Sequence, residues 1–142
     1  MTLDATTLNT QSFVVHDVDA FPIVRSRSGA IQPGYGAQWQ REMDALIAHG
    51  EPFVVIFDQG HPEEAHDDRK LRGLWLKRNR ERLAAMCKAV LAVEPNAGKR
   101  LALKAQAALV SKAFNVPMEI AATPAGAEDL AFAYLGMDTN SG

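Results

Sequence analysis

Apolar and polar positions follow two periods along this chain, and these periods divide it into expected strands and helices. Segments of strand length that are rich in apolar and β-branched residues occupy residues 12–18, 21–28, 52–57, 87–93 and 116–123. The segment PFVVIF, which ends at Phe57, is continuously apolar. Such a run is typical of a strand covered on both faces, so we expect it in the middle of a parallel sheet.

Segments with the helical period lie between or after the later strands, at residues 37–50, 64–85, 98–114 and 124–136. The apolar stripe of the first consists of Trp39, Met43, Leu46 and Ile47, and Gly50 ends that helix. The stripe of the third consists of Leu101, Ala105, Ala108 and Leu109. Because several of these side chains are small, we expect this stripe to pack closely on the sheet.

The resulting order, β-β-α-β-α-β-α-β-α, predicts a single-domain α/β fold with a mixed, mostly parallel sheet. The first two strands form an N-terminal edge hairpin, and the helices pack on the sheet. We expect the domain to span residues 11–136, between a flexible arm at residues 1–10 and a tail at residues 137–142.

Composition adds constraints on partners and compartment. The 142 residues are 47% hydrophobic and 23% charged with a net charge of −2, which predicts a globular protein without a nucleic-acid partner. Cys87 is the single cysteine, so an intrachain disulfide is excluded and a reducing, cytoplasmic compartment is expected. Its place at the start of a strand favours a buried structural thiol. No apolar run has the length of a membrane span.

The element order and the C-terminal sequence FNVPMEIAATPAGAEDLAFAYL resemble the STAS and SpoIIAA-like family. In this sequence Pro117 leads into the last strand, and an alanine-rich helix ends in an aromatic residue and a leucine, a pattern common in that family. The resemblance covers roughly residues 12–136. It implies a small regulatory or binding domain.

One departure from the family concerns its phosphorylation switch. Anti-sigma-factor antagonists of the family carry a phosphorylatable Ser or Thr after a central strand, where this chain has Asp58, Gln59 and Gly60. No serine or threonine occurs between Ser28 and Ser111. We therefore expect a member without the usual phosphoacceptor.

The loop after PFVVIF holds the candidate catalytic residues, Asp58 and His61, at the carboxyl end of a strand, where ligands of parallel sheets gather. An enzyme would use them as acid and base, whereas Asp58 could equally be a turn residue. A receiver-like site with Asp17 and Asp19 is a further alternative, which the number of helices and a missing lysine disfavour. His61 and His66 lie five apart, a poor spacing for a metal, so we expect neither metal nor cofactor.

The segment from Glu64 to Ala85 places acids before bases, as the helix dipole favours, and is our candidate partner surface. We expect Arg72, Arg78 and Asn79 to bind a partner protein or a second copy of the chain. Asn79 lies beside the apolar stripe, and the alternative is that its amide bonds the neighbouring backbone.

Function is therefore predicted as a non-enzymatic regulatory or protein-interaction module of STAS-like type. Two alternatives stay open, a small enzyme at Asp58 and His61, and a domain that binds a small molecule or lipid. The last requires a cavity between helices and sheet, lined by residues such as Trp39, Met43 and Trp75. The loop QPGYG, residues 32–36, lacks the phosphate-loop spacing but could also approach a ligand.

Overall fold

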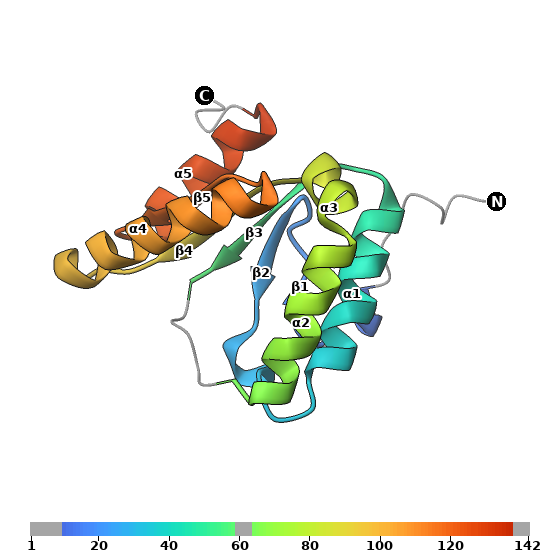
Figure 1. Cartoon of the computed structure of the whole chain (residues 1–142). Coiled ribbons are helices and arrows are strands. Elements are labelled where there is room, and N and C mark those ends of the chain that lie inside the picture. Colours follow the sequence, from blue (N-terminus) through green and yellow to red (C-terminus); the bar gives the residue numbers. More distant parts are fainter. Residues whose placement is uncertain (1–9, 59–63, 138–142) are drawn as a thin grey trace.

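The structure of the protein is a computed structural model that describes residues 10–58 and 64–137. Its sheet has five strands in the order β1-β2-β3-β4-β5. β1 and β2 are antiparallel, and each later neighbour is parallel. The strands are β1 (His16–Asp17), β2 (Ile23–Ser26), β3 (Phe53–Phe57), β4 (Cys87–Val93) and β5 (Met118–Ala121). The predicted α/β fold with a mixed, mostly parallel sheet and an edge hairpin is confirmed (Figure 1).

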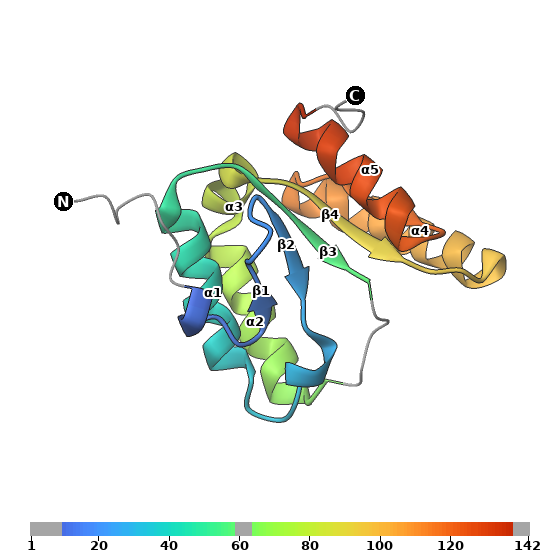
Figure 2. The same cartoon turned by 180° about the vertical axis from the view of Figure 1, so that it is seen from behind.

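Within the described residues, five α-helices accompany the sheet, together with short 3₁₀ turns at Thr10–Ser12 and Ser28–Ala30. The helices are α1 (Gly36–His49), α2 (His66–Arg78), α3 (Arg80–Met86), α4 (Ala97–Phe114) and α5 (Pro124–Leu135). Right-handed crossovers between sequential parallel strands bring the connecting helices to one face of the sheet. Helices α1–α4 accordingly lie on one face and α5 on the other, as the two opposite views show (Figures 1 and 2).

The central strand β3 divides its side chains between two apolar clusters. Phe53 and Val55 point into the cluster that contains α1, α2 and α3, whereas Val54 and Ile56 point into the cluster that contains α5. This is the alternation that a pleated strand imposes. The expectation that PFVVIF forms a buried strand in the middle of the sheet is confirmed.

Several predicted helix ends are also found. Gly50 follows α1 with a left-handed φ of 80°, a conformation that costs least for glycine. Thr123 caps α5 by accepting a hydrogen bond from the Gly126 amide, and Pro124 occupies the first turn.

The single helix predicted for residues 64–85 is wrong, because the chain forms two helices separated by Asn79. The backbone of Asn79 has φ −112° and ψ 19°, outside regular helix geometry. Its side-chain amide donates to the carbonyl oxygen of Trp75 at 2.9 Å. Of the two interpretations of Asn79, bonding to the neighbouring backbone is the one observed.

The orientation predicted for the alanine-rich helix is also wrong. In α4 the side chains of Leu101 and Leu109 are 71% and 73% exposed, and Ala105 and Ala108 also face solvent. The helix packs through its opposite side, where Ala107 is its buried residue. Alanine occurs on both sides of α4, so composition alone did not identify the inner side.

Candidate functional site

A cavity of about 390 Å³ lies on the sheet face that carries α1–α4. The residues that line it come from helices α1–α4 and from strands that include β3 and β4. Its apolar wall includes Val55, Phe57, Leu83, Val90, Val110 and Phe114. A volume of this size falls within the range of roughly 300–1,000 Å³ that small-molecule sites occupy.

Charged side chains gather where the cavity meets the carboxyl ends of the strands. Tyr35 directly precedes α1, Glu64 lies two residues before α2, and Arg69 and Arg72 belong to the first two turns of α2. In a parallel sheet, the loops and helix starts that follow each strand meet at this end, which explains why these residues converge. We call Tyr35, Glu64, Arg69 and Arg72 the charged mouth of the cavity.

Glu64 is the centre of the charged mouth. Its carboxylate accepts hydrogen bonds from Arg72 Nε at 2.5 Å and Nη2 at 2.7 Å, and from the hydroxyl of Tyr35. The bonds from Arg72 hold the pKa of Glu64 below its usual value, and the bond to Glu64 raises the pKa of Arg72. Burial, followed by the bond to Glu64, raises the pKa of Tyr35. The mouth therefore holds an ionised Glu64, a charged Arg72 and a neutral Tyr35.

The two arginines of the mouth differ in how firmly the protein holds them. Arg72 is bidentate on Glu64, and its guanidinium lies 5.6 Å from the ring centre of Trp39. Arg69 has a side chain that is 68% exposed, and its Nε lies 3.8 Å from Glu64 Oε1. The four residues of the mouth include two guanidiniums and one carboxylate, so these side chains together carry a surplus positive charge. Arg69 is the one that faces solvent.

The predicted partner residues therefore lie in different surroundings. Arg72 turns inward to the cavity, while Arg78 is exposed at the last turn of α2. Trp39 lines the cavity, as the ligand-binding alternative expects. Trp75 packs edge-to-face against Trp39, with 5.2 Å between the ring centres. Its Nε1 donates a hydrogen bond to Asp44 at 2.9 Å. Partner binding by Arg72, Arg78 and Asn79 stays a prediction.

The loop QPGYG, residues 32–36, binds a carboxylate of the protein itself. The amides of Gly34 and Gly36 donate to the two oxygens of Asp68 at 2.8 and 2.9 Å. Asp68 is 3% exposed and belongs to the first turn of α2. The loop thus fixes the start of α2, and with it the arginines of the mouth, against the start of α1.

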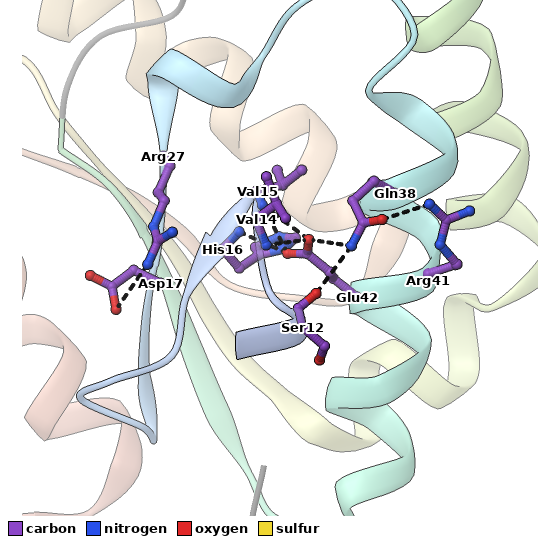
Figure 3. A network of polar contacts seen from close by, with 9 residues as sticks. All are labelled: Ser12, Val14, Val15, His16, Asp17, Arg27, Gln38, Arg41 and Glu42. Atoms are coloured by element: carbon purple, nitrogen blue, oxygen red, sulfur yellow. Dashed lines mark hydrogen bonds and ion pairs between the residues drawn. The ribbon is translucent and has the colours of Figure 1, made fainter. Parts of the chain in front are cut away.

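A second buried carboxylate, Glu42 of α1, fixes the first strand (Figure 3). Its oxygens accept the amides of Val14, Val15 and His16 at 2.7 to 3.1 Å, and lie 2.9 Å from His16 Nδ1. Burial alone would raise the pKa of Glu42, but these bonds and one from Gln38 outweigh it and lower the pKa to about 2. Glu42 is therefore ionised and holds α1 to β1.

The proposed catalytic pair is described only in part, since His61 lies outside the described residues. Asp58 follows β3 and lies 3.4 Å from Arg25, which also contacts Glu128 at 2.6 Å. Asp17 faces Arg27 at 3.9 Å and accepts the amide of Asp19. Arginines thus face Asp58 and Asp17, which does not favour the receiver-like alternative.

Cys87 lines the cavity but does not have the properties of a nucleophile. Its side chain is buried, its sulfur lies 3.4 Å from the carbonyl oxygen of Ala89, and burial raises its pKa to about 12. A thiol with this pKa stays protonated near neutral pH. The interpretation as a buried structural thiol is confirmed.

Comparison with known proteins found no protein family, curated protein or solved structure that matches this chain. The resemblance to the STAS and SpoIIAA-like family therefore stays a prediction. Within residues 10–58 and 64–137, no helix is long and apolar enough to cross a membrane. The same residues contain no group of three or more His, Cys, Asp or Glu side chains placed to hold a metal ion.

Proposed function

We propose that this protein is a non-enzymatic binding module for an amphipathic organic acid, whose apolar body occupies the cavity and whose acid group lies at Arg69. The proposal is carried by one observation, an apolar cavity whose charged mouth has a surplus cation. The proposal develops the ligand-binding alternative that the sequence leaves open. It is compatible with the predicted regulatory role if the bound ligand acts as the signal.

The charges of the mouth determine the class of ligand. Glu64 already occupies the Nε and Nη2 donors of Arg72, so a ligand meets Arg69 first. A carboxylate at this position would form charge-assisted hydrogen bonds with Arg69. Among the four residues of the mouth, a cationic ligand would meet two guanidiniums and one carboxylate.

The cavity chemistry supports binding rather than catalysis. Glu64 is ionised and held by Arg72 and Tyr35, and the thiol of Cys87 is protonated. Neither group is placed to exchange a proton with a bound acid near neutral pH. An enzymatic role for Asp58 and His61 remains an alternative prediction.

Calorimetric titration with dodecanoic acid and with dodecanol tests the head-group preference. We expect the acid to bind about tenfold more tightly, because hydrogen bonds to a charged partner contribute about 1.5–3 kcal/mol. Arg69→Gln removes this advantage and leaves dodecanol binding unchanged. Arg78→Gln, at the far end of α2, removes the same charge and alters neither affinity. Equal affinities for acid and alcohol in the unsubstituted protein would contradict the proposed ligand class.

A cavity-filling variant tests the place of binding independently. Val90 lines the cavity from β4, and Val90→Phe places a larger side chain in it. We expect both ligands to lose binding while the variant retains cooperative thermal unfolding. Binding by Val90→Phe at full strength would locate the ligand elsewhere.

A protein-interaction module is the second candidate, and the outer side of α2 favours it. Leu71 and Leu74 are 38% and 40% exposed there, close to the exposed Arg78. Exposed apolar side chains next to a cation are suited to an acidic protein partner. Native mass spectrometry of protein purified without denaturation distinguishes the candidates, because it detects both a retained acid and a second protein chain.

A further inference from the structure

Most residues of helix α4 are exposed to solvent. It is 18 residues long, and Ala107 is its buried residue. It rests on the sheet beside β5, and its start projects beyond the rest of the described chain (Figure 1). Most of this helix therefore contacts solvent rather than protein.

The outward side of α4 is apolar. Leu101 and Leu109 are 71% and 73% exposed, and two turns of helix place them about 12 Å apart. Ala105 and Ala108 lie between them on the same side and are exposed too. Solvent-facing leucines grouped on one side of a helix mark an interaction surface.

The charge of α4 has a single sign. It contains Lys99, Arg100, Lys104 and Lys112, and it contains none of the chain's 17 acidic residues. Arg100 donates to the carbonyl oxygens of Glu94 and Pro95, while the three lysines are exposed. By helical spacing, Lys99 and Lys104 lie on opposite flanks of the leucines, and Lys112 lies in line with them one turn beyond Leu109.

We propose that α4 docks this protein on an anionic membrane surface, with Leu101 and Leu109 entering the interface and the lysines contacting acidic head groups. A helix that combines an apolar side with basic flanks has the chemistry of an interfacial helix. A second copy of α4 does not fit this surface, because symmetric pairing would bring cations against cations with no acid between them.

The choice of a membrane over an acidic protein rests on the proposed function. Val110 and Phe114, on the inner side of α4, belong to the cavity wall, so the same helix contacts ligand and surroundings on its two sides. An amphipathic acid partitions into bilayers, which makes a bilayer its immediate source. Docking through α4 places the cavity wall next to that source.

Vesicle flotation of the full chain tests the docking. We expect binding to phosphatidylcholine vesicles that contain phosphatidylglycerol, weaker binding as salt increases, and little binding to phosphatidylcholine alone. Lys99→Gln with Lys104→Gln should lower the affinity on the order of 30-fold, since each lysine contributes about fivefold at an anionic surface. Leu101→Gln with Leu109→Gln should lower it about tenfold. All four side chains are exposed, so folding should be unaffected.

Matched controls separate this proposal from the proposed function. Lys70→Gln with Lys77→Gln removes the same charge from exposed positions of α2 and should leave vesicle binding intact. Val90→Phe should bind vesicles with normal affinity even though it no longer binds dodecanoic acid. The α4 variants should bind dodecanoic acid with normal affinity in the calorimetric titration. If the α4 substitutions leave the affinity for vesicles unchanged, the proposal is overturned. A dimer in native mass spectrometry that the leucine substitutions dissociate overturns it too, because α4 would then be the interface between copies.

Discussion

The two faces of the sheet are held to their helices in different ways. Under α5 the contact is small and apolar, with Ala127 and Ala131 fully buried against β3 and β4 residues such as Ile56 and Leu91. Under α1–α4 the apolar contact is interrupted by the cavity, and the polar residues that are buried in the described part of the chain belong to this face. They are His16, Ser26, Glu42 and Asp68.

The difference shows how a face can keep an open cavity without losing its helices. Apolar burial stabilises roughly in proportion to the area removed from water, so an incompletely covered face gains less from it. On this face, carboxylates join elements that apolar packing alone would hold less firmly. Glu42 joins α1 to the first strand, and Asp68 joins α2 to the start of α1.

The largest expected effect comes from removing one of these carboxylates. Glu42→Gln should lower the free energy of unfolding by about 3 kcal/mol near neutral pH, from the depression of its pKa from 4.5 to about 2. Because the folded-state pKa is depressed, this contribution is present above about pH 4.5 and is lost as the pH falls towards 2. Urea unfolding at a series of pH values measures both effects.

The control for this prediction is Glu51→Gln. Glu51 is 58% exposed and contacts His49 at 2.9 Å, so its removal should change stability by no more than about 1 kcal/mol. If Glu42→Gln showed the same acid-induced loss of stability as the unsubstituted protein, Glu42 would not be the group responsible.

An intermediate effect is expected from enlarging an alanine on each of the two alanine-rich helices. Ala131 is fully buried, so Ala131→Leu should overpack the contact and lower the free energy of unfolding by about 2 kcal/mol. Ala105→Leu on the outer side of α4 should change it by less than about 0.5 kcal/mol. Chemical denaturation of the two variants measures the contrast, and equal losses would mean that α4 packs through its outer side.

The smallest effect concerns the loop that binds Asp68. A Cβ at Gly36 would lie 2.9 Å from Asp68 Oδ1 and 3.3 Å from Asp68 Cα, so Gly36→Ala should destabilise by about 1 kcal/mol. Gly73 has no atom within 4 Å of such a Cβ, and Gly73→Ala should stabilise α2 by up to about 1 kcal/mol. Thermal unfolding reports the sign of each change. If both variants were stabilised, Asp68 would not lie as close to Gly36 as the structure places it.

The sequence predicted most of the architecture, because buried strands and packed helices have strong periodic patterns. PFVVIF, the stripe from Trp39 to Ile47 and the start of α5 are found where the pattern placed them. The outer side of α4 was misassigned because alanine accepts both burial and exposure at little cost. The break at Asn79 lies within a continuous helical pattern, so only the local capping bond distinguishes it.

The charged mouth was less predictable. Arg72 was predicted as a partner-binding residue, but no pattern indicated its pairing with Glu64. Glu64 in turn bonds Tyr35, from which α1 and β3 separate it along the chain. Glu42 had a readable signal, since it lies on the same helical side as Trp39 and Met43, where an acid requires several donors if it is buried. Those donors come from Val14, Val15 and His16, just before and at the start of β1, a long-range contact that periodicity does not contain.

The bond pattern of Glu42 also limits how another strand could add to the edge of the sheet. β1 is the outermost strand and has two residues, so the sheet ends in a short border that another molecule could extend. At that border the amides of Val14, Val15 and His16 are already engaged by one carboxylate. A foreign strand would have to displace an ionised side chain before it could add, and the domain is thereby protected from fibril-like growth at this margin.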